Sequence, residues 1–364
     1  MAKNIFIAAT GQNCGKTTTC IGLMHLAQKK YQRVGFIKPL GPKPIHYHRC
    51  TVDKDAALMA QVFEMDKDLR WMSPVVVHPD TTRKLVDGDI APHELHEKIM
   101  RAYAELEKRC DFIIIEGSGH PGVGSVLKTS NATIARMLNA PVLMVTGGGL
   151  GNVVDKIYMG LALFEKQGVE VRAVLANKLV PEKRARTLYY LSRALEDEKM
   201  QVIGGIDYHP VLADPTLRRV AKLLGLKIHG NRREAGRIIH HVQIGAASTS
   251  RVTELLQDAS LLIVTSSRDE LLVTLANLYQ IPAYRSRIVG LLIPGIAPIS
   301  NITRMILDRS NIPYLRTEAE TTASLYSIIS EDVSKITAAD AEKLSLIRTL
   351  AEAHIDFDLL DGIF

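Results

Sequence analysis

The chain has 364 residues, of which 46% are hydrophobic and 23% are charged, and its formal net charge is +6. These values are typical of a globular protein long enough for two domains. The moderate positive charge suits a small anionic ligand, whereas 5% aromatic residues and a single tryptophan do not provide an extended surface for stacking nucleic-acid bases. We therefore expect no nucleic-acid partner.

The sequence also bounds where the protein works. Its apolar runs stay well short of the roughly 20 residues that a membrane helix needs, and residues 1–4 are too few for a signal peptide ahead of the first apolar run. The four cysteines, Cys14, Cys20, Cys50 and Cys110, have neither paired nor metal-type spacing, which indicates a reducing compartment. We expect a cytoplasmic protein with no membrane contact.

Apolar runs alternate with helical patterns through the first half of the chain. Strands are expected at 4–9, 33–37, 112–116, 141–146, 171–176 and 201–205, and helices at 16–30, 53–64, 92–109, 153–167 and 184–198. Several of these strands are apolar on both faces, as parallel strands covered by helices are. The pattern predicts an α/β fold with a doubly wound, mostly parallel sheet, whose ligands bind at the carboxyl ends of the strands.

A basic stretch over 217–237 leads into a second, smaller α/β pattern. The stretch is either a solvated helix and linker or a patch for an anionic effector. Beyond it, strands are expected at 240–245, 260–265, 288–293 and 313–315, and helices at 248–257, 268–280, 300–310 and 318–329. A helical tail at 338–353 ends in apolar residues and is expected to pack against the protein. The predicted domains are 1–225, 226–335 and a tail of 336–364.

The segment 9–18 joins the first strand to the first helix and ends in Gly-Lys-Thr. A strand, a loop of small residues and a helix in this order are typical of a phosphate-binding loop, in which backbone N–H groups surround the phosphates. The standard spacing has glycine where Thr10 stands, and Gly11 follows one residue late; a chance Gly-Lys-Thr is the alternative. The expected nucleotide-binding residues are Thr10, Gly11, Gln12, Asn13, Cys14, Gly15, Lys16, Thr17 and Thr18.

Further polar residues follow other expected strands. Lys38 is expected to neutralise an anionic substrate or a transferring phosphoryl group, or else to be an ordinary surface lysine. Asp55 opens a helix, so it either caps that helix or binds Mg²⁺. Glu116 ends an apolar strand, where a carboxylate needs a cation, and is expected to bind Mg²⁺. Asn177 suits a purine edge or a turn, and the role of His120 stays open.

These residues together resemble a known group of enzymes. Residues 1–225 are similar to dethiobiotin synthetase, to the N-terminal domain of long phosphotransacetylases and to cobyrinic acid a,c-diamide synthase. The resemblance rests on the loop at 9–18, Lys38-Pro39, Asp55, Glu116-Gly117-Ser118-Gly119, Gly149-Leu150-Gly151-Asn152 and Asn177. The loop at 41–48 does not match its counterpart, and His120 replaces a glycine.

The resemblance implies a role for each matching residue. Lys16 and Thr17 would hold the phosphates and Mg²⁺, and Asp55 and Glu116 would complete the metal site. Lys38 would face an acceptor carboxylate or carbamate. Asn177 would read the adenine of ATP. The catalytic residues implied are Lys16 and Lys38, and the cofactors are ATP and Mg²⁺.

Residues 240–330 are similar to the DRTGG domain that follows the synthetase-like domain in those phosphotransacetylases. The similarity lies in the segments 243–248 and 267–270, although Ser267 stands where an aspartate is expected and Pro294-Gly295-Ile296 replaces Thr-Gly-Gly. Arg268 could bind an anion or pair with a neighbouring carboxylate. The effector of this domain is not indicated by the sequence.

Two functions follow from these features. The first is a Mg-ATP-binding protein, an ATPase whose DRTGG-like domain is regulatory or senses a ligand. The alternative is an ATP-dependent ligase that acts on a small carboxylate or carbamate. The resemblance implies that glutaminase activity would need a cysteine nucleophile and transacetylation a large C-terminal domain. Because no cysteine follows Cys110 and only a short tail follows residue 330, we expect neither activity, unless ammonia or a partner subunit replaces the glutaminase. The family resemblance and the apolar C-terminal residues suggest a homodimer.

Overall fold

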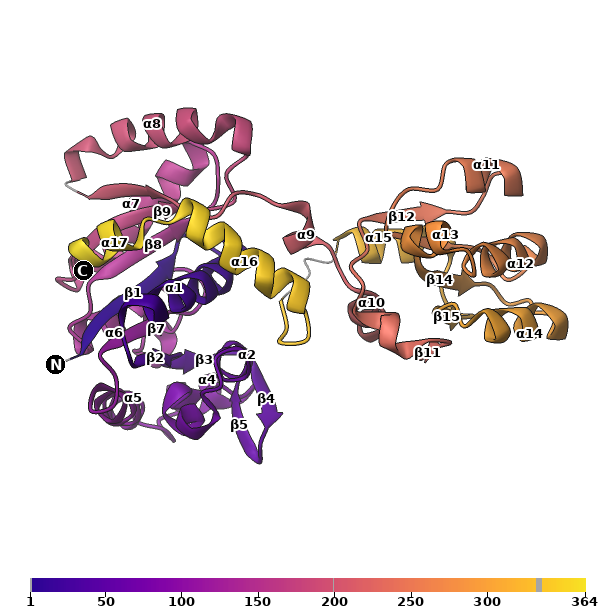
Figure 1. The fold of residues 1–364 in the computed structure, drawn as a ribbon. Coiled ribbons are helices and arrows are strands. Elements are labelled where there is room, and N and C mark those ends of the chain that lie inside the picture. The colour runs from indigo at the N-terminus through magenta and orange to yellow at the C-terminus, as the bar shows by residue number, and fades with distance from the viewer. Residues whose placement is uncertain (1, 199, 332–335) are drawn as a thin grey trace. The chain divides into compact units, whose positions relative to one another are not determined.

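A computed structural model describes residues 2–198, 200–331 and 336–364 (Figure 1). The chain forms two compact units. The first consists of Met1–Tyr208 together with Ala341–Phe364, and the second of His209–Asp340. Each unit has its own sheet and its own hydrophobic core.

The first unit is built on a parallel sheet of six strands in the order β10-β9-β8-β1-β7-β2. The strands are β1 (Lys3–Ala9), β2 (Val34–Ile37), β7 (Phe112–Glu116), β8 (Val142–Thr146), β9 (Val171–Ala176) and β10 (Gln201–Gly204). The inner strands β7 and β8, on either side of β1, are buried along their whole length. The predicted doubly wound, mostly parallel α/β fold is confirmed. Strands that are apolar on both faces must be covered by helices on both sides of the sheet.

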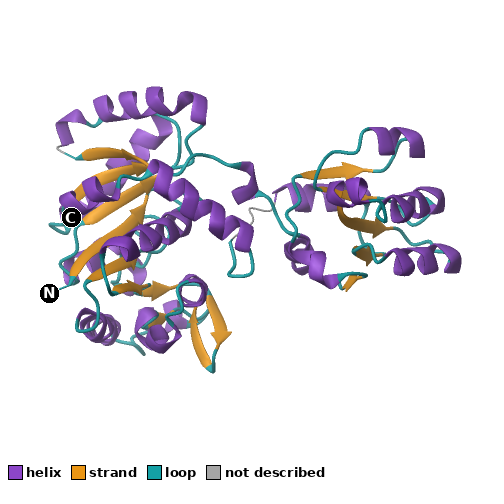
Figure 2. Ribbon diagram, viewed as in Figure 1, coloured by secondary structure: helices purple, strands orange, loops and turns teal. Residues whose placement is uncertain are grey.

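Helices cover this sheet on both faces (Figure 2). They are α1 (Lys16–Lys30), α2 (Lys54–Val62), α3 (Leu69–Met72), α4 (Thr81–Val86), α5 (Pro92–Glu107), α6 (Asn131–Met137), α7 (Gly151–Lys166) and α8 (Arg184–Ala194). Local signals set their starts. Pro92 occupies the first turn of α5, and Glu94 accepts a hydrogen bond from the N–H of Ala91 (3.2 Å). The Ser130 side chain caps α6 by accepting from the Thr133 N–H (3.1 Å).

Short strands between β2 and α2 were not expected from the sequence. Strands β4 (Pro44–Tyr47) and β5 (Cys50–Asp53) form an antiparallel hairpin, and β3 (Leu40–Gly41) pairs in parallel with β6 (Val75–Val76). At the tip of the hairpin His48 and Arg49 both have a positive φ. The hairpin therefore includes most of the segment 41–48, which does not match its counterpart in the resembling enzymes.

The second unit has a five-stranded sheet in the order β11-β15-β14-β13-β12. Strands β12 (His241–Ile244), β13 (Ser260–Ile263), β14 (Ile288–Pro294) and β15 (Tyr314–Thr317) are parallel, whereas β11 (Ile228–His229) is antiparallel. Its helices are α9 (Pro210–Ala213), α10 (Leu217–Leu224), α11 (Thr249–Glu254), α12 (Asp269–Leu278), α13 (Pro282–Arg287), α14 (Asn301–Ser310) and α15 (Thr322–Glu331). This is the smaller α/β unit that the second half of the sequence predicts.

The border between the units differs from the expected one at residue 225. Helix α10 buries Leu217, Val220 and Ala221 in the core of the second unit, beside Leu261 and Ile263 of β13. The segment 209–225 therefore belongs to the second unit. The basic residues indicate a solvated helix and linker; the helix is present, and its one apolar face is enough to make it part of a core.

The C-terminal segment packs on the first unit. Helix α16 (Ala341–His354) lies along α1, and α17 (Phe357–Ile363) follows it (Figure 1). Gly22 of α1 faces Ala351, and a Cβ on this glycine would lie 2.9 Å from the Ala351 Cβ. Glu352 pairs with His25 and Lys29, both at 2.5 Å. Residues 341–364 are thus part of the nucleotide-loop unit, although 132 residues of chain, 209–340, separate them from the rest of it.

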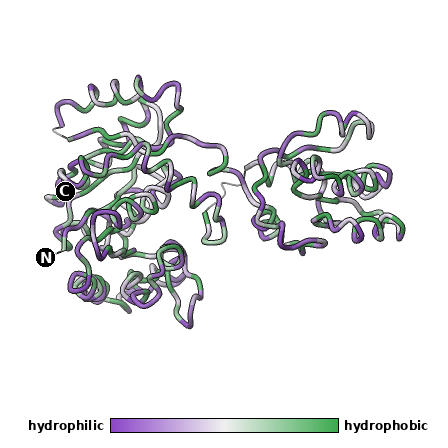
Figure 3. Tube along the Cα trace, viewed as in Figure 1, coloured by the Kyte–Doolittle hydropathy of each residue, from purple (hydrophilic) through white to green (hydrophobic). Residues whose placement is uncertain are grey.

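Hydrophobic residues concentrate along the strands of each unit and on the helix faces that cover them (Figure 3). Among the described residues, no helix is both long enough and apolar enough to span a membrane.

Candidate functional site

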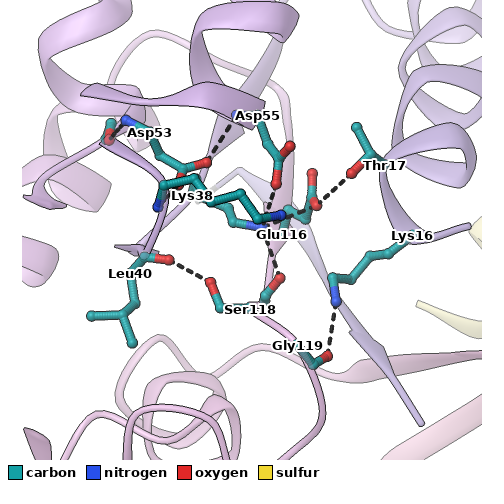
Figure 4. A network of polar contacts seen from close by, with 12 residues as sticks. Lys16, Thr17, Lys38, Leu40, Asp53, Asp55, Glu116, Ser118 and Gly119 are labelled. Carbon is teal, nitrogen blue, oxygen red and sulfur yellow. Dashed lines mark hydrogen bonds and ion pairs between the residues drawn. The ribbon is translucent and has the colours of Figure 1, made fainter. Parts of the chain in front are cut away.

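The candidate site lies at the carboxyl ends of β1, β2 and β7. Ile7 of β1 pairs with Glu116, and Ile37 of β2 pairs with Ile115. Lys38, the residue after β2, therefore lies beside Glu116 at the end of β7 (Figure 4). Parallel strands bring these sequence-distant residues to one sheet edge, as the alternating pattern predicts.

Residues 10–18 form a loop between β1 and α1. Thr10 is anchored by its N–H to Val145 O (3.0 Å) and by its hydroxyl to Thr146 Oγ1 (3.1 Å). Asn13 and Gly15 have φ angles of 61° and 85°. Left-handed residues within such a loop turn successive N–H groups toward one side, which makes an anion-binding concavity. Lys16 and Thr17 then begin α1, where the helix dipole adds positive character.

Lys38 joins the two carboxylates of the site. Its ammonium donates to Glu116 Oε1 (3.0 Å) and to Gly117 O (3.0 Å), and it pairs with Asp55 Oδ2 at 3.3 Å. The residue is only 2% exposed and Glu116 is fully buried. An ammonium has three N–H donors, so these three acceptors satisfy it. Lys38 is not the ordinary surface lysine that the sequence left open.

Asp53 and Asp55 have different structural roles. The sequence allowed Asp55 to cap α2, but Asp53 is the capping residue and accepts from the Asp55 N–H (2.8 Å). Asp53 also accepts from the Lys43 N–H (3.0 Å). Because Asp53 supplies the cap, the Asp55 carboxylate is available for Lys38. The Asp55 side chain thus faces the charge cluster rather than its own helix.

Burial and neighbouring charges shift the pKa values within this cluster. Burial, and next the charge of Lys38, lowers the pKa of Lys16 to about 8. Burial would also lower the pKa of Lys38, but Glu116 and Asp55 outweigh it, and the pKa of Lys38 is raised. Burial works against ionised Asp55, yet Lys38 holds the pKa of that carboxyl below its usual value. The lysine nearer the phosphate loop is therefore the one that loses its proton more readily.

Lys16 contacts the loop that follows β7. Its ammonium donates to Gly119 O at 2.9 Å. Thr17 donates its hydroxyl hydrogen to Glu116 Oε1 (3.2 Å), the same oxygen that accepts from Lys38. The other oxygen of the carboxylate, Glu116 Oε2, is buried and has no hydrogen-bond partner among the described residues. A buried carboxylate oxygen without a partner is costly and marks a place where a cation or a donor would be accommodated.

The residues present fit a bound Mg²⁺. Thr17, Asp55 and Glu116 supply hydroxyl and carboxylate oxygens, which Mg²⁺ prefers, and one of those oxygens is the unpartnered Glu116 Oε2. No group of three or more His, Cys, Asp or Glu side chains suited to a metal occurs in the described part of the chain. A metal held here would therefore need phosphate oxygens and water to complete its coordination, as Mg²⁺ at nucleotide sites commonly does.

Asn177 packs against the phosphate loop. Its side-chain NH₂ donates to Cys14 O at 3.0 Å, and the residue is 2% exposed. A Cβ on Gly15 would lie 2.2 Å from the Asn177 Nδ2, so only glycine fits beneath this amide. The Oδ1 atom has no partner among the described residues. Asn177 therefore belongs to the site, where it braces the loop.

Asn131 is a site residue that sequence reasoning missed. Its Oδ1 accepts from the Ser118 N–H (2.9 Å), and its Nδ2 donates to Ser118 O and His120 O, both at 2.8 Å. It thereby fixes the loop whose Gly117 and Gly119 carbonyls accept from the two lysines. The Ser-Asn pair ahead of an apolar helix signals a cap, but nothing local indicates that the second residue turns back to the loop after β7.

The side chain of His120 contributes to the same loop, because its Nδ1 accepts from the Gly122 N–H at 3.2 Å. In the second unit, Arg268 donates to the carbonyls of Gly245 (3.1 Å), Ala246 (3.3 Å) and Ala247 (3.0 Å) and pairs with Glu270 at 2.5 Å. Its guanidinium thus holds a loop and a carboxylate. Of the two expectations for Arg268, the neighbouring carboxylate matches the contacts.

These features define a P-loop nucleotide-binding domain. They are β1, the loop with left-handed residues that follows it, Lys16 and Thr17 at the start of α1, and Glu116 at the end of β7. Residues 3–216 match the AAA_26 family, which is described as an AAA domain, and the chain belongs to this family. The match includes every residue of the candidate site.

The chain is also similar in sequence to three characterised groups of enzymes. A phosphate acetyltransferase of Nitratidesulfovibrio vulgaris is 23% identical over 98% of this chain and 51% of its own length. The ATP-dependent dethiobiotin synthetase of Clostridium kluyveri is 26% identical over 65% of this chain and 92% of its own length. The cobyric acid synthase of Lachnoclostridium phytofermentans is 28% identical over 50% of this chain and 38% of its own length. The chain spans about half the length of the phosphate acetyltransferase. The expected relationship to dethiobiotin synthetase and phosphotransacetylases is confirmed.

Proposed function

We propose that the first unit binds Mg-ATP at the loop of residues 10–18 and hydrolyses its terminal phosphoryl bond. The observation that carries this proposal is that the partly buried Lys16, Thr17 and Asp55 gather around the buried Glu116 at the end of β7. The ammonium of Lys16 suits the negative phosphates, and the Thr17 hydroxyl with the two carboxylates suits their positive metal ion.

Each residue has a role in this proposal. The loop N–H groups and Lys16 hold the β and γ phosphates, and Thr17, Asp55 and Glu116 hold Mg²⁺. The metal supplies charge neutralisation of the phosphate oxygens. Asn177 braces the loop through Cys14 O and offers its unpartnered Oδ1 to a donor such as the adenine amino group. Phosphoryl transfer requires positioning and charge neutralisation more than covalent chemistry. Residues of these types can provide both.

The second unit is proposed to be a DRTGG-like regulatory or ligand-sensing domain. Support comes from its separate, mostly parallel sheet, in which Arg268 holds the loop after β12 and Arg316 holds the loop after β14. A homodimer in the cytoplasm remains part of this proposal, on the basis of the family resemblance. In this proposal, the second unit regulates the rate at which the first unit turns over ATP.

Binding calorimetry with Mg-ATP tests the proposal. Lys16→Ala removes the charge that faces the phosphates and is expected to abolish measurable binding. Lys183→Ala, an exposed lysine in the turn before α8, is the matched control and should bind as the wild type does. If Lys16→Ala bound Mg-ATP as tightly as the control, the assignment of this loop would be wrong.

A second candidate is an ATP-dependent ligase. It is favoured by the match to nearly the whole length of a dethiobiotin synthetase and by the buried lysine at the end of β2, where an acceptor anion could be held. A screen of small carboxylic and diamino acids for stimulated ADP release separates the two functions. Stimulation by one compound, with one ADP released per acceptor consumed, would favour the ligase; ADP release independent of every acceptor would favour the regulated ATPase.

A further inference from the structure

Lys38 occupies the position between the two acidic side chains of the site. Its ammonium lies 3.3 Å from Asp55 Oδ2 and 3.0 Å from Glu116 Oε1 in a buried setting (Figure 4). Two carboxylates held this close in a buried cluster repel each other unless a cation separates them. The ammonium supplies that cation within the chain itself.

The third donor of Lys38 is also used. Gly117 O accepts it at 3.0 Å, in the loop that Asn131 fixes. In this arrangement Lys38 therefore has no N–H left for a phosphate or an acceptor anion. Any contact with a ligand requires it to give up at least one of its three partners.

Mg²⁺ and the Lys38 ammonium compete for the same two carboxylates. Lys38 contacts Glu116 Oε1 and Asp55 Oδ2, and the metal would bind Asp55 and the unpartnered Glu116 Oε2. A metal on Asp55 and Glu116 would carry two positive charges at the place where the ammonium now contributes one. Both cations cannot keep these contacts, because like charges a few ångströms apart repel strongly where water is scarce.

We propose that Lys38 is a resident counter-ion that a divalent cation displaces. Without metal, Lys38 neutralises Asp55 and Glu116 and keeps the site assembled. When the metal takes those carboxylates, the ammonium is released toward an anionic group of the ligand. The inference deepens the proposed Mg-ATP site, on which it rests, and it makes metal binding the step that frees Lys38.

The test is divalent-cation binding without nucleotide, measured as the loss of the free Mn²⁺ signal in electron paramagnetic resonance. Lys38→Met removes the competitor and keeps the aliphatic stem, and it is expected to tighten Mn²⁺ binding about tenfold or more. Lys43→Gln is the matched control. Lys43 is exposed and acts on Asp55 only through space, so its loss should change Mn²⁺ binding less than about twofold.

Equal or weaker Mn²⁺ binding by Lys38→Met, including no binding by either protein, would overturn the inference. Should the variant not fold, because two buried carboxylates lose their partner, the wild type answers the question. In protein labelled with ¹³C at the lysine ε-carbons, the Lys38 signal, identified by its loss in Lys38→Arg, should move when Mg²⁺ alone is added. A Lys38 signal unmoved by Mg²⁺ would contradict displacement.

These measurements are independent of the proposed function. They use the metal alone, whereas the function is judged by Mg-ATP binding to Lys16→Ala. A protein that binds Mg-ATP but whose Lys38 ignores the metal refutes only the displacement. A protein whose Lys38 responds to metal while Lys16→Ala still binds Mg-ATP normally refutes only the assigned phosphate loop.

Discussion

At the scale of single residues, Lys16 and Lys38 carry the same charge in one cluster, yet their surroundings shift their pKa values in opposite directions. Lys38 is buried and Lys16 is partly buried, and the loss of water around an ammonium disfavours its charged form. Lys38 has two carboxylates in contact, whereas the ammonium of Lys16 donates to the carbonyl of Gly119. The pKa of Lys38 is therefore raised, whereas the pKa of Lys16 is lowered to about 8.

This difference predicts how nucleotide binding depends on pH. With the pKa of Lys16 at about 8, the ammonium is present below pH 8 and is lost above it. Phosphates favour the charged form, so binding above pH 8 requires a proton to be taken up, and affinity should fall by up to about tenfold per pH unit there.

Calorimetry in buffers of different ionisation enthalpy measures that proton. Binding of Mg-ATP should take up about 0.1 proton at pH 7 and about 0.9 at pH 9. Uptake near zero at pH 9 would show that Lys16 is already fully protonated in the free protein, or that it does not face the phosphates.

Asn131 yields a second prediction at this scale. Asn131→Ala removes the three hydrogen bonds that hold the loop of Gly117 and Gly119, and should weaken Mg-ATP binding by about tenfold or more, as loss of a supporting contact at a metal site commonly does. Ser130→Ala is the control on the same helix. It removes the cap of α6, at a stability cost of about 1 kcal/mol, but leaves Asn131 in place.

The two variants separate support from stability. Ser130→Ala should lower the midpoint of thermal unfolding and bind Mg-ATP normally. If both variants weakened binding in proportion to their loss of stability, Asn131 would have no particular role in the site.

Among the site residues, those that follow or end strands could be predicted from the sequence, whereas Asn131, which lies at the start of a helix, could not. Lys38 and Glu116 could be placed together because parallel strands end at one edge. The sequence could not show whether Asp53 or Asp55 caps α2. Asp53 precedes the helix and Asp55 lies in its first turn, and only the orientation of the side chains decides which one caps it. The reach of Asn131 back to Ser118 spans 13 residues and leaves no local pattern.

At the scale of elements, the long strands and helices of both sheets could be predicted from the sequence, whereas the hairpin β4–β5 could not. The apolar runs of β7 and β8 have one physical explanation, which is burial on both faces. The segment around Pro42 and Pro44 reads as a loop, since proline cannot donate within a sheet. A two-stranded hairpin with an exposed tip tolerates it because only one edge must be paired.

The packing of α16 on α1 gives a prediction at this scale. Gly22→Val would bring a branched side chain against Ala351 and should destabilise the protein by about 2 kcal/mol. Adding Ala351→Gly should recover part of the loss, because it removes the Cβ that would lie 2.9 Å away. Chemical denaturation monitored by circular dichroism checks both. A double variant no more stable than Gly22→Val would show that the two helices do not meet at this position.

At the scale of the whole molecule, the chain completes its nucleotide unit only after forming a second one. The expected tail of 336–364 was recognised as a helix with apolar residues, but its partner could not be, because its contacts with α1 join residues more than 300 positions apart, such as His25 and Glu352. Helix α1 therefore carries the phosphate loop at its start and the C-terminal segment along its length. Helix α16, which follows the second unit in the chain, reaches α1 by packing and by the pairs of Glu352 with His25 and Lys29.

The most direct test of the central claim is an experimental structure of the full chain with Mg²⁺ and a non-hydrolysable ATP analogue. The triphosphate is expected within the loop of residues 10–18, with Lys16 moved from Gly119 O to the phosphates and the metal on the side of Thr17, Asp55 and Glu116. A nucleotide bound elsewhere, with Lys16 still on Gly119 O, would contradict the account.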